Sequence, residues 1–86
     1  MTDALATALE LAPLIERVHG TNHPELTRVR ELTFAIDAET DPARRADLFA
    51  ELRSVTDNYA LPADACEAYT GTYQALQQAD QRLTRS

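Results

Sequence analysis

The sequence predicts an all-α fold: a small antiparallel bundle of about four helices, in a single domain spanning residues 1–86. Apolar residues recur at spacings of three and four, and no run alternates with the period of two that strands require. Proline and glycine positions divide the chain into helical segments joined by short connections, which favour antiparallel neighbours. A chain of 86 residues is also too short to bury two separate cores.

The first predicted helix runs from Thr2 or Asp3 to His19. Its apolar residues repeat at helical spacing: Leu5, Leu9, Leu11, Leu14, Ile15 and Val18. Pro13 interrupts this segment, because proline has no N–H and its ring crowds the carbonyl of Leu9. The helix therefore either kinks at Pro13, or ends near Leu11 and restarts with Pro13 in a first turn. Gly20 follows and is a typical residue just past a helix end.

The second helix is predicted to start at Asn22-His23-Pro24-Glu25 and to run to about Glu39. Asn22 is a good N-cap, Pro24 suits a first turn, and Glu25 stands at capping-box spacing from Asn22. The inward positions at helical spacing are Leu26, Val29, Leu32 or Thr33, and Ile36.

The third helix is predicted over residues 42–57, with Asp41 as an acidic N-cap and Pro42 in the first turn. Its inward residues are Leu48, Phe49, Leu52 and Val55. Residues 58–62 form a turn that carries an apolar plug.

The last helix is predicted from about Pro62 to about Thr84, with an inward seam spaced three and four apart: Cys66, Tyr69, Tyr73, Leu76, Asp80 and Leu83. The three tyrosines of the chain are expected to be amphipathic plugs of the core. Gly71 costs about 1 kcal/mol relative to alanine inside a helix, and the close approach of another helix, within the fold or across a dimer, would explain it.

Composition excludes several classes of function. The net charge is −6, lysine is absent, and the arginines are interleaved with acids, so no clustered basic face is available for nucleic acid or an anionic membrane. No apolar run approaches the ~18 residues of a membrane span, and the N-terminus has no signal-peptide pattern, so we expect a cytoplasmic protein. Cys66 is the only cysteine, which excludes an internal disulfide or a multi-cysteine metal site. We expect it to be a small buried hydrophobe.

Four candidate metal ligands lie near the first turn of the chain: Glu16, His19, His23 and Glu25. Imidazole and carboxylate are ligands that iron, manganese and zinc accept. Glu16 and His19 have the Glu-x-x-His spacing found in carboxylate-bridged di-iron bundles. The alternative is structural: His19 packs against or caps the helix end, and His23 is solvated before Pro24.

Asp80 is a fifth candidate ligand, because a carboxylate on an inward seam must be paired, hydrogen-bonded, metal-bound or protonated. The hydroxyls of Tyr69 or Tyr73, or an arginine of a neighbouring helix, would satisfy it; alternatively, it reaches water at a frayed helix end. No nucleophile triad, Cys–His pair or phosphate loop is readable, so we do not expect an enzyme. A small enzyme with Cys66 as nucleophile is the least favoured hypothesis.

Two stretches carry a family resemblance. Residues 16–20, Glu-Arg-Val-His-Gly, and residues 23–26, His-Pro-Glu-Leu, resemble the hemerythrin-like domain of the RIC (repair of iron centres) family of di-iron proteins. Residues 56–59, Thr-Asp-Asn-Tyr, followed by Pro62, Asp64-Ala65-Cys66, Tyr69 and Tyr73, are similar to the C-terminal segment of that family. Only His19 falls on a ligand position of the family, whose central ligand segment and N-terminal cysteine-containing domain have no counterpart here. The chain resembles a shortened relative with an incomplete di-iron site.

The resemblance implies an accessory protein in iron–sulfur cluster repair or iron handling under oxidative or nitrosative stress, with iron as the metal. Metal or a partner would then bind at the end that holds His19, His23 and Glu25, with Glu16 and Asp80 nearby, and a homodimer would bring two such ends together. The alternative is a metal-free helical interaction module that kept the fold and lost the site. Such a module would bind itself or another protein through an exposed apolar or tyrosine-bearing face.

Overall fold

A computed structural model describes residues 4–84 and confirms the prediction of a small all-helical bundle. Four helices follow one another along the chain: α1 (Ala4–His19), α2 (Glu25–Ala38), α3 (Pro42–Val55) and α4 (Glu67–Thr84). Residues 4–84 contain no strand. The molecule measures 33 × 26 × 19 Å along its principal axes.

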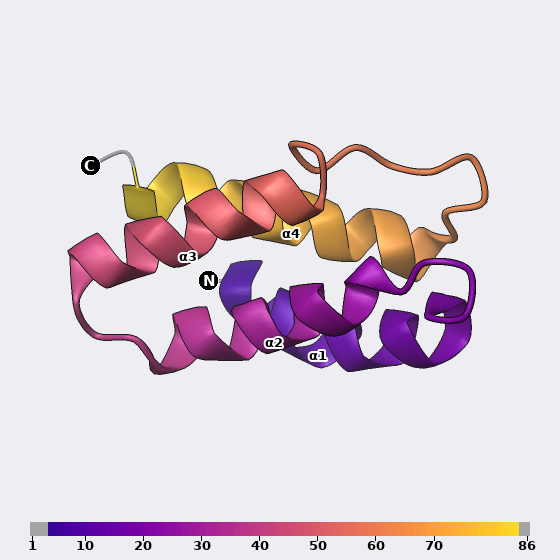
Figure 1. The fold of residues 1–86 in the computed structure, drawn as a ribbon, viewed down its shortest axis with the longest axis horizontal. Helices are drawn as coiled ribbons and strands as arrows, with labels where there is room; N and C mark the ends of the chain where they lie inside the picture. Colours follow the sequence, from indigo (N-terminus) through magenta and orange to yellow (C-terminus); the bar gives the residue numbers. More distant parts are fainter. Residues whose placement is uncertain (1–3, 85–86) are drawn as a thin grey trace.

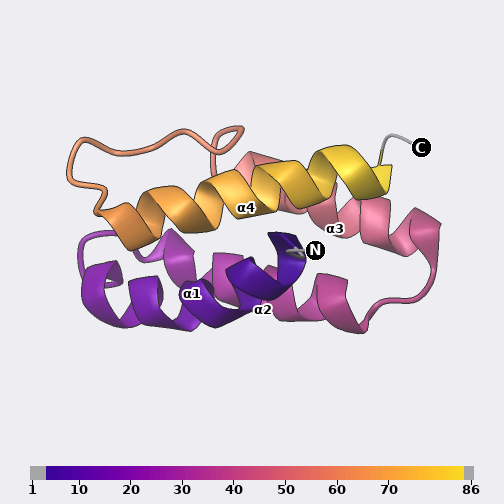
Figure 2. The same cartoon turned by 180° about the vertical axis from the view of Figure 1, so that it is seen from behind.

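The helices form two layers, with α1 and α2 in one and α3 and α4 in the other (Figure 1). α1 packs most extensively on α4, and each helix contacts the next one along the chain. Seen from behind, α4 lies directly over α1 (Figure 2). The short connections at residues 20–24 and 39–41 hold their flanking helices antiparallel.

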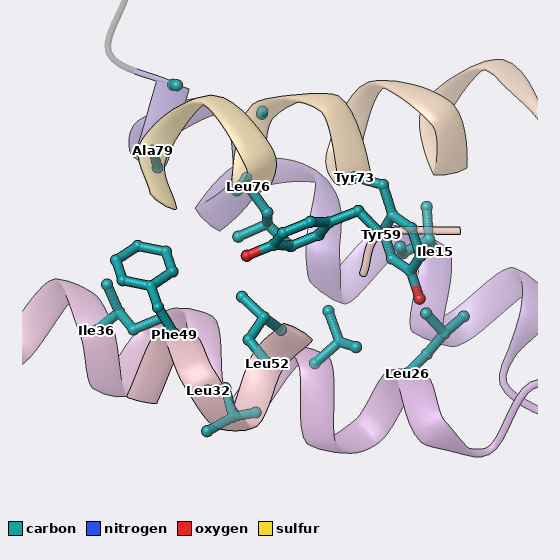
Figure 3. Close-up of a cluster of buried hydrophobic side chains, with 14 of the residues drawn as sticks. Ile15, Leu26, Leu32, Ile36, Phe49, Leu52, Tyr59, Tyr73, Leu76 and Ala79 are labelled. Atoms are coloured by element: carbon teal, nitrogen blue, oxygen red, sulfur yellow. The ribbon is translucent and has the colours of Figure 1, made fainter. Parts of the chain in front are cut away.

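The core lies between the two layers, where side chains from all four helices converge (Figure 3). Its largest fully buried members are Tyr69, Phe49, Ile15, Leu26, Leu32, Ile36, Leu52, Leu76, Val29, Thr33 and Thr72. The predicted inward face of α2 is confirmed, since Leu32 and Thr33 are both buried. All three tyrosines are buried, as predicted for core plugs, so the tyrosine-bearing surface proposed for an interaction module is not present.

The buried face of α1 differs from the predicted leucine stripe. The buried residues of α1 are three alanines and one isoleucine: Ala4, Ala8, Ala12 and Ile15. Leu14 and Val18 are exposed. α1 contacts both α2 and α4, and alanines allow the backbones to approach closely where a leucine would hold them apart. The predicted start at Thr2 or Asp3 lies outside the described residues.

Pro13 does not end α1. The helix continues from Ala4 to His19 through the proline, so the second of the two predicted alternatives, an end near Leu11, does not hold. Packing against two neighbouring helices offsets the cost of the one main-chain hydrogen bond that proline removes.

The two prolines at helix starts behave differently. Asp41 caps α3 as predicted, because its side chain accepts a hydrogen bond from the Ala43 N–H at 2.9 Å and Pro42 occupies the first turn. The predicted cap of α2 is wrong: Pro24 is the residue that precedes the helix, and it has no side-chain cap hydrogen bond. Asn22 instead donates its backbone N–H to the His19 carbonyl at 3.1 Å, within the preceding turn.

The connection between α3 and α4 spans residues 56–66 and is longer than predicted, since α4 begins at Glu67 and not near Pro62. Asp57, Asn58 and Tyr59 have φ values of 52°, 59° and 64°, in the left-handed region that non-glycine residues rarely adopt. The Thr56 side chain accepts the Tyr59 N–H at 2.9 Å, and the Tyr59 hydroxyl donates to Asp80 at 2.9 Å. These two hydrogen bonds stabilise the turn and hold the Tyr59 ring in the core.

Gly71 is not required by a close helix approach. A methyl group added there would lie 3.6 Å from the Leu11 Cδ1 atom, an ordinary van der Waals distance. None of the helices within residues 4–84 has the length and apolar character needed to cross a membrane.

Candidate functional site at the histidine end

Parts of the two stretches that resemble the RIC family lie at the same end of the bundle: residues 19–25 of the first, and residues 64–69 of the second. The connection between α1 and α2 and the beginning of α4 meet there in both views (Figures 1 and 2). Their chemistry-bearing side chains form what we call the histidine cluster: His19, His23, Glu25, Asp64, Cys66 and Tyr69.

His19 contacts the only cysteine of the chain. Its Nε2 atom lies 3.2 Å from Cys66 Sγ, a hydrogen bond between residues far apart in sequence. Cys66 is exposed, so the expectation of a buried hydrophobic cysteine is wrong. Cys66 directly precedes α4, and its carbonyl accepts the Thr70 N–H at 2.9 Å. Its side chain therefore lies at the bundle end and not on the inward seam.

His23 lies between two carboxylates. Its Nε2 atom is 2.9 Å from Asp64 Oδ1 and 3.1 Å from Oδ2, and its Nδ1 atom is 3.3 Å from Glu25 Oε2. The hydrogen bond to Asp64 is the main cause that raises the pKa of His23 above its usual value. The same bond lowers the pKa of Asp64, and the charge of nearby His19 adds to that effect. Asp64 is thus within electrostatic reach of both histidines.

The backbone between the two histidines forms a hydrogen-bonded turn. The His19 carbonyl accepts the N–H groups of His23 at 2.8 Å and Asn22 at 3.1 Å, and the Glu16 carbonyl accepts the Gly20 N–H at 2.8 Å. A Cβ atom at position 20 would overlap the Glu16 carbonyl oxygen. Glycine is therefore required at this position, and it sets the path that brings both imidazoles to one side.

Tyr69 packs against both imidazoles. Its ring centroid lies 5.2 Å from that of His19 and 5.7 Å from that of His23, both in edge-on geometry. Burial raises the pKa of the Tyr69 hydroxyl. A cavity of about 240 Å³ adjoins the cluster, lined by Glu25, Tyr69 and Tyr73 together with residues of the α3–α4 connection. The aromatic ring restricts how the two histidines can turn.

Glu16 is paired with residues of α2. Hydrogen bonds from Thr27 and Arg30 lower its pKa, and the Arg30 Nε to Glu16 Oε1 distance is 2.6 Å. The structure thus uses this carboxylate to tie α1 to α2.

Asp80 lies in a separate network. It is buried, and it accepts hydrogen bonds from Arg53 Nη1 at 2.7 Å, the Tyr59 hydroxyl at 2.9 Å and the Thr84 hydroxyl at 2.9 Å. An arginine of a neighbouring helix satisfies it, as one of the alternatives predicted. It stands about 16 Å along α4 from Tyr69, given the helical rise of 1.5 Å per residue.

These positions do not fit the di-iron centre that the resemblance implies. Such a centre needs several carboxylates and histidines from different helices around two ions. Glu16 forms an ion pair with Arg30 and Asp80 forms one with Arg53, and Asp80 lies far from the histidines. Within residues 4–84, no group of three or more His, Cys, Asp or Glu side chains is arranged to hold a metal ion as it stands.

The sequence pattern missed Asp64 and Cys66 as partners of the histidines. Asp64 is 41 positions from His23, and Cys66 is 47 positions from His19, so no local spacing relates them. The one available signal was that both belong to the second of the two resembling stretches.

No family model, curated protein or solved structure matches this chain.

Proposed function

We propose that this chain is a metal-handling accessory protein in iron–sulfur cluster repair or iron handling under oxidative or nitrosative stress, acting in the cytoplasm in the manner of the RIC family. One observation carries this proposal. Residues 19–25 of the first resembling stretch and residues 64–66 of the second, distant in sequence, meet at the histidine cluster and supply nitrogen, oxygen and sulfur donors there.

The donors support metal handling for a chemical reason. Imidazole, carboxylate and thiolate are the protein ligands of divalent iron and zinc. The cluster lies at the end of the bundle, where Cys66 and Asp64 are exposed, so an ion can enter and leave without opening the core. That arrangement suits temporary holding and transfer of an ion better than permanent storage.

The test is a deletion strain exposed to nitric oxide, followed by the activity of a cluster-dependent dehydratase during recovery. We expect slower recovery in the deletion strain, rescue by the wild-type chain, and no rescue by a chain carrying both His19→Ala and His23→Ala. Glu10→Gln, a change at an exposed carboxylate of α1, is the matched control and should rescue fully. Equal recovery with and without the gene would contradict the proposal.

A second candidate is the metal-free interaction module, favoured by the exposed apolar side chains of the described residues. Val18 is 65% exposed, and Leu14, one helical turn earlier on α1, is 38% exposed. On α2, Phe34 is 45% exposed. For this function we expect Val18→Asp or Phe34→Asp to abolish self-association or partner binding, measured by light scattering and pull-down, while His19→Ala has no effect.

A further inference from the structure

We propose that the histidine cluster is a mononuclear site for one divalent transition-metal ion of the Zn²⁺ or Fe²⁺ class, bound by His19 Nε2, His23 Nε2, Asp64 and Cys66 Sγ. The use of the ion rests on the proposed function, whereas the ligand set rests on the geometry alone. The site differs from a carboxylate-bridged di-iron centre in nuclearity and in having a sulfur ligand.

The donors already lie in two pairs at nearly the separation of neighbouring ligands. In a tetrahedral site with bonds of ~2.0–2.3 Å, adjacent nitrogen and sulfur ligands are about 3.6 Å apart, and nitrogen and oxygen ligands about 3.3 Å. The corresponding distances here are 3.2 Å for His19 Nε2 to Cys66 Sγ and 2.9 Å for His23 Nε2 to Asp64 Oδ1. Binding of the ion would therefore replace the hydrogen bond within each pair by two metal–ligand bonds. The distance between the two donor atoms of each pair would increase by a few tenths of an ångström.

The two pairs are also close to each other. The imidazole centroids of His19 and His23 are 6.4 Å apart, whereas two imidazoles on one tetrahedral ion would be about 5 Å apart. Both Nε2 atoms are directed at one short segment, because Asp64 and Cys66 are separated by a single residue. That segment begins with a turn in which the Pro62 carbonyl accepts the Ala65 N–H at 3.1 Å. No three of these donors surround a common point as they stand, so the inferred site requires side-chain rotation to bring the two pairs around one ion.

Glu25 has the position of an orienting carboxylate and not of a ligand. It contacts His23 Nδ1 at 3.3 Å, the nitrogen opposite to the one proposed to bind the ion. A carboxylate on the remote nitrogen fixes the ring orientation and leaves Nε2 for the metal, an arrangement common in metal sites. The edge-on packing of both imidazoles against Tyr69 restrains them further.

The donor set selects the class of ion. Two imidazoles, one thiolate and one carboxylate suit ions of borderline softness and four-coordinate geometry, and they disfavour Mg²⁺ and Ca²⁺, which require oxygen ligands. Metal binding by thiol and imidazole groups releases protons, so acidification disfavours it. A site with two exposed donors, Asp64 and Cys66, suits transfer of an ion.

The test uses Co²⁺ as an optical probe for the full chain, with the thiol kept reduced. We expect saturation at one equivalent, visible absorption of tetrahedral intensity and a sulfur-to-cobalt charge-transfer band, all displaced by Zn²⁺. Cys66→Ser should remove the charge-transfer band, His19→Ala and His23→Ala should abolish saturable binding, and Glu25→Gln should weaken binding about 10- to 100-fold. Glu16→Gln is the control carboxylate and should bind as the wild type does. Circular dichroism verifies that each variant is folded.

A second readout does not depend on variants. Zn²⁺ should protect Cys66 of the wild-type chain from alkylation at equimolar metal, and Mg²⁺ should not. A spectrum without charge transfer, saturation at two equivalents, or alkylation unaffected by Zn²⁺ would overturn the inference. If the chain binds Co²⁺ tightly but its deletion causes no repair defect, the metal site is supported and the proposed function is refuted. If the chain binds no Co²⁺ and the Cys66→Ser and Asp64→Asn variants still rescue the repair defect, the proposed function is supported and the metal site is refuted.

Discussion

Replacing Asp80 with asparagine should destabilise the fold strongly without affecting metal binding. The substitution keeps the shape of the side chain and an acceptor for the Tyr59 hydroxyl, but it removes the charge that pairs with Arg53 at 2.7 Å. Breaking a buried ion pair by removing one partner costs ~3–5 kcal/mol. The Arg53 side chain is 38% exposed and recovers part of its hydration, so we expect a loss of about 2–3 kcal/mol.

That loss is large for a domain of this size. Total stability is roughly 5–10 kcal/mol for a domain of this length, and each kcal/mol shifts the melting temperature by ~4–8 °C, so Asp80→Asn should lower Tm by roughly 10–20 °C. The assay is thermal and urea unfolding followed by circular dichroism. Asp47→Asn, at an exposed carboxylate of α3, is the matched control and should change stability by less than ~0.5 kcal/mol.

A double-mutant cycle with Arg53→Gln isolates the pair. Because the two side chains are in direct contact, we expect a coupling energy of at least ~1 kcal/mol. If Asp80→Asn is as stable as Asp47→Asn, or if the cycle shows no coupling, the assignment of Asp80 to a structural network fails and its role as a ligand must be reconsidered.

Three further outcomes follow from the packing and the charges. Gly20→Ala should destabilise the fold and perturb the NMR resonances of both histidines, because a Cβ atom there overlaps a backbone carbonyl. Gly71→Ala should instead stabilise the fold by about 0.5–1 kcal/mol. Equal melting temperatures for the two variants would contradict this contrast. Ala8→Leu should cost about 1–3 kcal/mol in urea unfolding, because position 8 is fully buried between helices; a neutral result would refute the alanine face of α1. The pKa of Glu16 is lowered in the folded state, so its stabilising contribution is complete above the unfolded pKa and is lost as the pH falls through the folded value. Glu16→Gln should therefore flatten the acid limb of a stability–pH profile, and an unchanged limb would exclude the ion pair with Arg30.

Local rules were enough to predict the helices wherever the relevant residues are near one another in sequence. Asp41 and Pro42 mark the start of α3 by a cap and a preset φ, and both act as expected. The apolar face of α2, from Leu26 to Ile36, follows from its periodicity alone. The buried carboxylate and its arginine partner were predictable in kind, because an inward Asp80 needs a cation.

The remaining features depend on contacts between distant residues. Hydropathy ranks leucine above alanine, so the periodic pattern of α1 favoured Leu14 and Val18 over the alanine face that close packing selects. The left-handed turn at residues 57–59 lengthens the connection before α4, and no local propensity favours a positive φ at a tyrosine. Cys66 moves from the inward seam to the surface because α4 begins one residue after it. The pairing of Asp64 with His23 exists only once both connections meet.

The most direct measurement is a Zn²⁺ titration of the ¹⁵N-labelled chain, followed by the imidazole nitrogen chemical shifts. The chain has two histidines, so both sets of signals are assigned with one variant. We predict that the Nε2 signals of His19 and His23 shift together and saturate at one equivalent, while Nδ1 of His23 remains protonated toward Glu25. If neither Nε2 signal responds, or if only one does, the histidine cluster is not a metal site and the metal-free interaction module becomes the better description.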